Sequence, residues 1–152
     1  MRVIQPPNRP VDAPRPWIFV AGSIGMGTAE DWQARLVGLL IKDFEGTLWN
    51  PRRDDWDPTW EQRASNPRFA EQVNWELDAI ILANQVVMYF DPATKSPITL
   101  LELGLLAGNP KLTVCCPDGF WRKGNVEIVC ERYQTPLLHT FDDLVARMKE
   151  MR

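Results

Sequence analysis

The sequence predicts an α/β fold in which helices cover both faces of a five-stranded, doubly wound parallel sheet. Five short apolar segments, rich in β-branched and aromatic residues, alternate along the chain with segments of helical periodicity. A helix between consecutive strands is the usual crossover of a parallel sheet. The chain has 152 residues, enough for one such domain to bury roughly two thirds of its unfolded surface.

The first 16 residues differ in composition from the rest of the chain. Prolines are too frequent in residues 1–16 for a helix or an interior strand, and we expect this segment to form an extended arm. Residues 17–152 contain no internal repeat and no linker-like segment. We therefore expect them to form a single domain.

The first strand of this domain, residues 17–21, leads into a loop that is rich in glycine. Gly22 and Ser23 at its start would let the backbone approach a ligand closely at the carboxyl end of a strand. The glycine spacing fits neither the dinucleotide fingerprint nor the Walker motif, and a loop that only needs positive φ angles explains it equally well. We expect Thr28 to be the N-cap of a helix over residues 29–43.

A second strand, residues 46–49, is followed by a loop of unusual composition. Three tryptophans lie within residues 49–60, among arginines, aspartates and an asparagine. Aromatic faces beside polar groups suit a flat heterocyclic ring, and packing of the loop onto the domain is the alternative. The candidate substrate contacts of this loop are Asn50, Arg52, Asp55 and Trp56.

Residues 67–82 have the apolar spacing of an amphipathic helix and carry two carboxylates near its middle, Glu76 and Asp78. A buried strand, residues 85–90, follows and ends at Asp91. Ligands of open α/β sheets bind beyond such carboxyl ends, which makes Asp91 a candidate substrate contact. The helical carboxylates either belong to the same site or are charges on a solvated face.

The next helix is almost wholly apolar, and Glu102 is its only ionisable residue. We expect Ser96 to be the N-cap, with a hydroxyl that accepts a backbone hydrogen bond, before Pro97 at the first helical position and Gly108 at the stop. A buried carboxylate is costly unless it has a partner or faces a cavity where a ligand uses it. Glu102 is therefore a candidate catalytic residue, and a narrow solvated stripe on the helix is the alternative.

The rest of the chain completes the alternating pattern. The expected elements are strands over residues 111–116 and 136–139 and helices over residues 126–132 and 141–150. A polar aromatic loop begins at Phe120 and ends at Asn125, which is a further candidate substrate contact.

Composition limits the partners of the protein. A net charge of −3 disfavours nucleic-acid polymers and anionic membranes, and no apolar run approaches the ~20 residues that span a bilayer. The N-terminus does not have the pattern of a signal peptide, so we expect a cytoplasmic protein that binds a small molecule. Three cysteines cannot form a disulfide framework, no metal-ligand spacing is present, and the only histidine, His139, is interpreted as structural.

Together, these motifs resemble the nucleoside 2-deoxyribosyltransferases and their close relatives, over roughly residues 17 to 139. The most specific part is Tyr89-Phe90-Asp91-Pro92, followed by the segment from Ser96 to Gly104 with its Glu-Leu-Gly step. Supporting motifs are Ala21-Gly22-Ser23, Asn50-Pro51-Arg52, Trp75-Glu76 and the segment from Phe120 to Asn125.

The resemblance implies a flavodoxin-like fold and a homo-oligomer, either a dimer-based tetramer or a hexamer. Glu102 matches the nucleophile of the family, and Glu76 lies where the family has an acidic residue of the active site. Asn125 matches an asparagine that contacts the sugar from an adjacent subunit. The chain departs from the family at Ser96, where the better-known bacterial members have an aspartate.

The implied reaction exchanges bases between a deoxynucleoside donor and a free nucleobase acceptor. Glu102 would attack the anomeric carbon to form a covalent glycosyl-enzyme, and a second base would then displace it. Two inversions give net retention, and no metal or cofactor is needed. Glu76 or Asp55 would protonate the leaving base.

Two other functions remain open. A hydrolase of the N-glycosidic bond in nucleoside 5′-monophosphates would need a phosphate clamp, for which Ser23, Ser96 and Lys95 are candidates. A nucleotide-binding module without turnover is disfavoured, because it gains nothing from burying Glu102 beside an electron-rich sugar oxygen.

Overall fold

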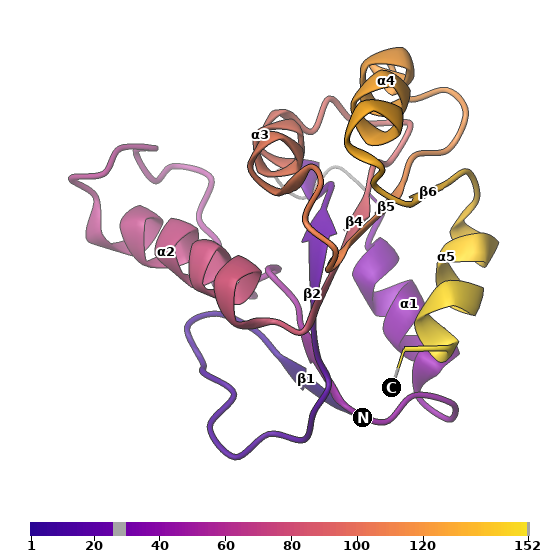
Figure 1. Ribbon diagram of the computed structural model, residues 1–152. Helices are drawn as coiled ribbons and strands as arrows, with labels where there is room; N and C mark the ends of the chain where they lie inside the picture. The colour runs from indigo at the N-terminus through magenta and orange to yellow at the C-terminus, as the bar shows by residue number, and fades with distance from the viewer. Residues whose placement is uncertain (26–29, 152) are drawn as a thin grey trace.

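A parallel sheet of six strands forms the centre of the computed structural model, which describes residues 1–25 and 30–151 (Figure 1). The strands are β1 (Arg2–Ile4), β2 (Trp17–Gly22), β3 (Thr47–Trp49), β4 (Gln85–Tyr89), β5 (Leu112–Cys115) and β6 (Leu137–Leu138). Their order across the sheet is β1-β3-β2-β4-β5-β6, and each neighbouring pair is parallel.

Helices cover both faces of this sheet, as Figure 1 shows. The helices are α1 (Trp32–Leu40), α2 (Pro67–Leu82), α3 (Pro97–Leu106), α4 (Lys123–Tyr133) and α5 (Phe141–Lys149). One apolar cluster joins the sheet to α2, α3 and α4, and a second joins it to α1 and α5. The predicted α/β, doubly wound architecture is confirmed. With β1 set aside, the strand order is that of a flavodoxin-like sheet.

The predicted number of five strands is wrong by one, because the structure has six. The additional strand, β1, comes from the segment that we expected to form an extended arm, and it pairs with β3 at the edge of the sheet. It lies before the first proline of the chain and contains Val3 and Ile4, whose branched side chains favour a strand. Ile4 is only 4% exposed and belongs to the apolar cluster beneath α2, α3 and α4.

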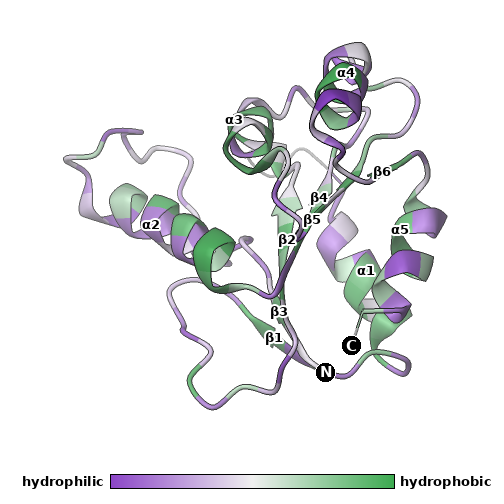
Figure 2. Ribbon diagram, viewed as in Figure 1, coloured by the Kyte–Doolittle hydropathy of each residue, from purple (hydrophilic) through white to green (hydrophobic). Residues whose placement is uncertain are grey.

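The central strands are apolar on both faces because helices cover both. Side chains of β2 alternate between the two clusters, with Phe19 in one cluster and Ile18 and Val20 in the other. Green strands run through the middle of Figure 2, and α2, α4 and α5 carry purple segments, whereas α3 is mostly green. Among the helices of the described residues, none combines the length and the apolar character that crossing a bilayer requires.

Two helix starts differ from the predicted ones. Helix α1 begins at Trp32 with Asp31 as N-cap, whose carboxylate accepts a hydrogen bond of 2.9 Å from the Ala34 amide. Thr28, the predicted N-cap, lies outside the described residues. Helix α4 begins at Lys123 rather than at residue 126, because the Val126 amide already donates to the Arg122 carbonyl. Asn125 therefore lies in the first turn of a helix and not in a loop.

Gly22 allows the last residue of β2 to lie against the last residue of β4. Its φ angle is +139°, and a Cβ at this position would lie 2.3 Å from the Tyr89 carbonyl oxygen. That oxygen also accepts a hydrogen bond from the Ser23 amide, at 3.2 Å. A residue with a side chain would have to separate the two strands at the edge where ligands of such sheets bind.

Gly22→Ala should lower the free energy of unfolding by at least about 1–3 kcal/mol, because the new methyl group overlaps a backbone carbonyl. Gly38→Ala in α1 is the matched control, since no atom lies within 4 Å of its Cβ position. The control should gain about 0.5–1 kcal/mol from helix propensity. Urea denaturation measures both values, and an unchanged midpoint for Gly22→Ala would contradict the steric argument.

Candidate active site

The candidate site lies at the carboxyl ends of β2 and β4, where the chain reverses its direction of progress across the sheet. Strand β2 is flanked by β3 on one side and by β4 on the other, so the loops after β2 and β4 diverge toward opposite faces. Ser23 follows β2, and Asp91 follows β4. Both side chains are buried, at 1% and 8% exposure, as expected for polar groups that line a site.

Three hydroxyl groups converge at this edge. Ser23 Oγ lies 2.5 Å from Ser96 Oγ and 3.0 Å from Thr94 Oγ1, and the two last oxygens are 2.6 Å apart. The Asp91 amide donates to Ser23 Oγ at 2.8 Å, which joins the loop after β4 to the end of β2. Sequence analysis identified Ser23, Asp91 and Ser96 but missed Thr94. The sequence did contain a signal for Thr94, because it is a hydroxyl residue two positions before the predicted N-cap, Ser96.

Ser96 occupies the predicted N-cap position, and Pro97 is the first residue of α3. The predicted capping hydrogen bond is wrong, because the Ser96 side chain accepts none from the helix. Its backbone is left-handed, with φ of +44°, whereas capping side chains usually start from an extended backbone. The Ser96 hydroxyl instead contacts Ser23 and Thr94.

Glu102 lies on the buried side of α3, where it is 7% exposed. The alternative, a position on a solvated stripe of the helix, is therefore excluded. Within the described part of the chain its carboxylate has no hydrogen-bond partner. Burial raises its pKa to about 8, and the negative charge of Glu76 contributes in the same direction.

Glu76 of α2 is the acidic group that interacts with Glu102. Gln72, one turn earlier on the same helix, donates a hydrogen bond of 2.8 Å from Nε2 to Glu76 Oε1. Burial raises the pKa of Glu76 to about 7, and the hydrogen bond from Gln72 opposes this effect. The second predicted carboxylate of α2, Asp78, instead forms an ion pair of 2.6 Å with Arg9 on the surface.

Two neighbouring carboxyl groups with pKa values near neutrality can exchange protons with a substrate at physiological pH. Desolvation makes each group easier to protonate than it is in water, and the negative charge of Glu76 acts on Glu102 in the same direction. Such pairs divide the roles of nucleophile and acid in glycoside cleavage. The arrangement is therefore suited to breaking a glycosidic bond.

Asn50 and Arg52 shape the loop after β3. The buried Asn50 side chain accepts a hydrogen bond of 3.0 Å from the Arg52 amide, which closes a tight turn. The Arg52 guanidinium reaches α1, with Nε 2.8 Å from Gln33 Oε1 and Nη2 2.8 Å from the Glu30 carbonyl oxygen. Arg52 thus joins the loop after β3 to α1 and the segment before it, whereas the Asn50 side chain bonds within its own loop.

Asp55 and Trp56 are held farther along the same loop. Asp55 is exposed and accepts two hydrogen bonds from Arg53, at 2.7 and 3.2 Å, which lower the pKa of its carboxyl group. A group with a lowered pKa is a poorer proton donor than Glu76. Arg53 also contacts Glu71 of α2 at 3.1 Å, and Trp56 packs edge-on against Trp60. These contacts pack the loop onto the domain.

Asn125 is exposed on the first turn of α4. Its backbone nitrogen donates to the Arg122 carbonyl oxygen at 3.0 Å. Within the described chain, its side chain forms no hydrogen bond with Glu102 or Glu76. The structure therefore does not bring Asn125 together with the two carboxylates in one chain.

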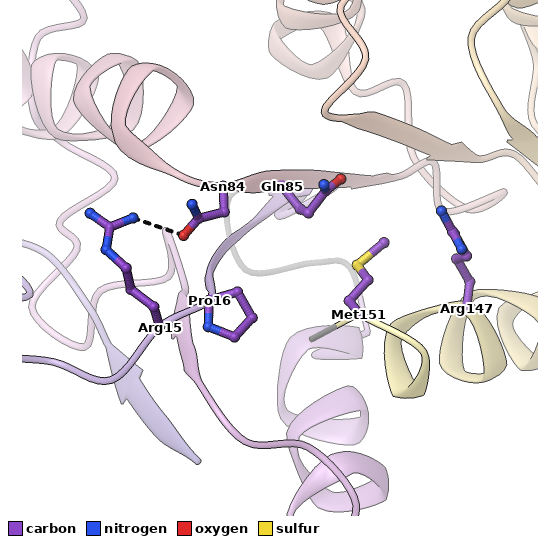
Figure 3. A pocket seen from close by; sticks show the side chains of 6 residues that line it. All are labelled: Arg15, Pro16, Asn84, Gln85, Arg147 and Met151. Atoms are coloured by element: carbon purple, nitrogen blue, oxygen red, sulfur yellow. Dashed lines mark hydrogen bonds between the residues drawn. The ribbon is translucent and has the colours of Figure 1, made fainter.

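A hollow of about 350 Å³ lies at the opposite, amino-terminal ends of β2 and β4 (Figure 3). Its two arginines are partnered, since Arg15 donates to Asn84 at 2.9 Å and Arg147 contacts Glu150 at 3.3 Å. No carboxylate of the candidate site lines it. The hollow is therefore separate from the candidate site.

Residues 15–120 match a protein family described as nucleoside 2-deoxyribosyltransferase like. The chain belongs to this family. The matched segment contains the carboxyl ends of β2 to β5 and both carboxylates, and the family places the chain among enzymes that act on nucleosides. The family resemblance inferred from the sequence is thus confirmed.

The fold also has a solved counterpart. A conserved protein from Enterococcus faecalis V583 superposes with a TM-score of 0.61 over 88% of this chain and 97% of its own chain, at 12% sequence identity. At this identity the likeness supports the fold alone. No curated protein sequence matches the chain.

Glu102→Gln should remove a pH dependence of folding stability. The folded state keeps the proton of Glu102 up to a pKa of about 8, whereas a carboxyl with the ordinary value of 4.5 has lost it. The unfolded chain then binds fewer protons than the folded chain, so stability falls as pH rises through this window. Relative to wild type, the variant should be similar at pH 5 and more stable by about 2–4 kcal/mol at pH 8.5.

Denaturant unfolding at the two pH values measures this difference. An equal advantage of the variant at both pH values would show that the gain comes from packing and not from the buried charge.

Proposed function

We propose that this chain exchanges the nucleobases of 2′-deoxyribonucleosides through a covalent 2-deoxyribosyl intermediate on Glu102, with net retention at the anomeric carbon. The observation that carries this proposal is the pairing of a buried carboxylate, which has no hydrogen-bond partner within the described chain, with a second carboxyl group on the adjacent helix. The family provides the substrate class.

In the first step, a Glu102 oxygen bonds to C1′ as the bond between C1′ and the base breaks. The electron pair of that bond goes to the ring nitrogen, and Glu76 supplies the proton that the leaving base needs. In the second step, a nitrogen of another base bonds to C1′, the ester bond to Glu102 breaks, and Glu76 takes up the proton of the incoming base. Two inversions at C1′ give retention.

Glu102 must be ionised and Glu76 protonated when the substrate binds, so the pair carries one proton in its working form. Burial raises the pKa of both carboxyl groups, so a pair that holds one proton is available near neutral pH. Positive charge develops on the sugar at the transition state and stabilises the Glu102 carboxylate. Charge development thus favours the form of the pair in which Glu102 is ionised and Glu76 holds the proton that the leaving base needs.

The hydroxyl cluster supports a second candidate, hydrolysis of nucleoside 5′-monophosphates. Ser23, Thr94 and Ser96 present three hydroxyls beside the N-terminus of α3, and no carboxylate contacts any of their oxygens in the described structure. Hydroxyl groups and a helix N-terminus can bind a phosphate, whereas a carboxylate side chain at the same position would repel it. The exposed Lys95 precedes Ser96 and can add a positive charge.

One assay separates these functions. A deoxynucleoside is incubated with and without a second free base, and a nucleoside 5′-monophosphate is incubated in parallel. A new nucleoside that forms only with the second base supports the transferase. Free base from the monophosphate alone would replace it with the hydrolase, and no turnover of either substrate would favour a binding module.

Glu102→Ala should lower turnover by several orders of magnitude without loss of the fold, because the substitution removes the nucleophile from an apolar helix. A 2-fluoro sugar nucleoside should leave the mass of the sugar on the peptide that contains Glu102, as mass spectrometry can show. Asp78→Ala is the control on α2 and should remain active and be labelled. Label on another peptide would overturn the assignment of the nucleophile.

We further propose that the enzyme is a homo-oligomer that buries the outer face of α3. Ile98, Leu101 and Leu105 form one stripe on this helix and are 59–62% exposed, although the opposite face of α3 is already in the core. A helix that is apolar all round is typically covered on all sides. Figure 2 shows α3 mostly in green. In the proposed assembly, Asn125 completes the site of a neighbouring subunit.

Mixing inactive Glu102→Ala with inactive Asn125→Ala should restore part of the activity. Some sites of the mixed oligomers would combine an intact Glu102 from one chain with an intact Asn125 from another. Light scattering after chromatography gives the mass of the oligomer, and Leu101→Glu should lower that mass by placing charges in the interface. Demonstrated subunit exchange without recovered activity would place both residues in the site of one chain.

A further inference from the structure

We infer that Gln72 is a positioning residue for Glu76, which holds one carboxyl oxygen as an acceptor and thereby leaves the other, Oε2, to carry the proton. The inference rests on the proposed role of Glu76 as the acid of the reaction. Nothing in the sequence pointed to Gln72, whose side chain lies on the buried face of α2, one turn before Glu76.

The amide of Gln72 is fixed by two acceptors. Nε2 lies 2.8 Å from the Pro51 carbonyl oxygen and 2.8 Å from Glu76 Oε1, and each of its two hydrogens has one of these partners. A flipped amide would place Oε1 of Gln72 against a carbonyl oxygen and a carboxyl oxygen, so only one orientation is favourable. The side chain is 5% exposed, which limits its access to other rotamers.

The oxygen of the same amide indicates that Gln72 is kept for the hydrogen bonds that its nitrogen donates. Gln72 Oε1 is buried and has no hydrogen-bond partner among the described residues. An acceptor of this kind costs stability that an apolar side chain at the same position would not cost. The contacts that the amide does make are those that hold Glu76 and the loop after β3.

The contact with Gln72 decides which oxygen of Glu76 can be the donor. Because Oε1 accepts a hydrogen from Nε2, a proton on Glu76 resides on Oε2. When Glu76 releases that proton to a leaving base, the amide hydrogen bond stabilises the new carboxylate. Burial keeps the pKa of Glu76 high, and Gln72 acts in the opposite direction, so the acid remains protonated but releases its proton more easily.

No charged group of the described residues stabilises the Glu76 carboxylate by an ion pair, so the hydrogen bond from Gln72 is its main local stabilisation. Glu102 of α3 repels a second negative charge on the pair. Arg53, from the loop after β3, contacts α2 at Glu71, and Arg9, from the N-terminal segment, contacts it at Asp78. Neither cation forms an ion pair with Glu76 in the described structure.

The test measures the pKa of Glu76 directly, by carbon NMR titration of the glutamate carboxyl groups in the full chain. Gln72→Met has a similar length and no donor, and it should raise the pKa of Glu76 by roughly one pH unit. Gln72→Asn, too short to reach Oε1, should raise it similarly. Asn74→Met is the control, because the exposed Asn74 bonds only to the Ala70 carbonyl on the same helix.

The rate of base exchange provides the second measurement. Gln72→Met should lower kcat about 10-fold and move the high-pH limb of the rate profile upward, because the acid keeps its proton to higher pH. In a Glu76→Gln background the same substitution should change the residual rate less than twofold. A purely structural role for Gln72 would instead lower both rates by the same factor.

An unchanged pKa of Glu76 in both Gln72 variants would overturn the inference, whatever the enzyme catalyses. An equal loss of rate in both backgrounds would overturn it as well. A raised pKa combined with full activity of Glu76→Gln would support the contact with Gln72 and contradict the proposed acid role of Glu76 instead.

Discussion

The site depends on the close approach of β2 and β4 at their carboxyl ends. Gly22 lies so near Tyr89 that a side chain would overlap the Tyr89 carbonyl, and the next residue, Ser23, bonds to the loop after β4. Three hydroxyls and the start of α3 then converge on one point. Gly22 is thus required for the close approach of the two strands, whether or not a ligand binds there. The start of α3 in turn determines where Glu102 lies.

Burial of two interacting carboxyl groups destabilises the fold and at the same time suits the proposed chemistry. Glu102 has no hydrogen bond within the described residues, and the partner of Glu76 is a neutral amide rather than a cation. A salt bridge would have stabilised both charges but would also have lowered both pKa values and weakened a nucleophile or an acid. The proposed reaction near neutral pH therefore requires that this part of the protein be less stable than it could be.

Local sequence patterns predicted the parts of the molecule that local physics determines. Runs of branched and aromatic residues located β2 to β6, and the apolar helix made its lone ionisable residue, Glu102, a candidate that the structure shows to be buried. The contacts of Thr94 and Gln72 were missed because they depend on loops that meet only after the sheet has formed. The capping bond of Ser96 was predicted wrongly because its left-handed backbone is set by the same tertiary contacts.

In the proposed mechanism, the balance between base exchange and hydrolysis depends on which nucleophile reaches the sugar ester of Glu102. Ile98 and Leu105 lie one turn before and after Glu102 on α3, and both are about 60% exposed in the single chain. An ester on Glu102 would therefore lie next to this exposed stripe along the helix, although Glu102 itself is only 7% exposed. In the proposed oligomer a second copy covers the stripe, so that the free base becomes the favoured acceptor. Assembly and reaction outcome are then two consequences of the same face of one helix.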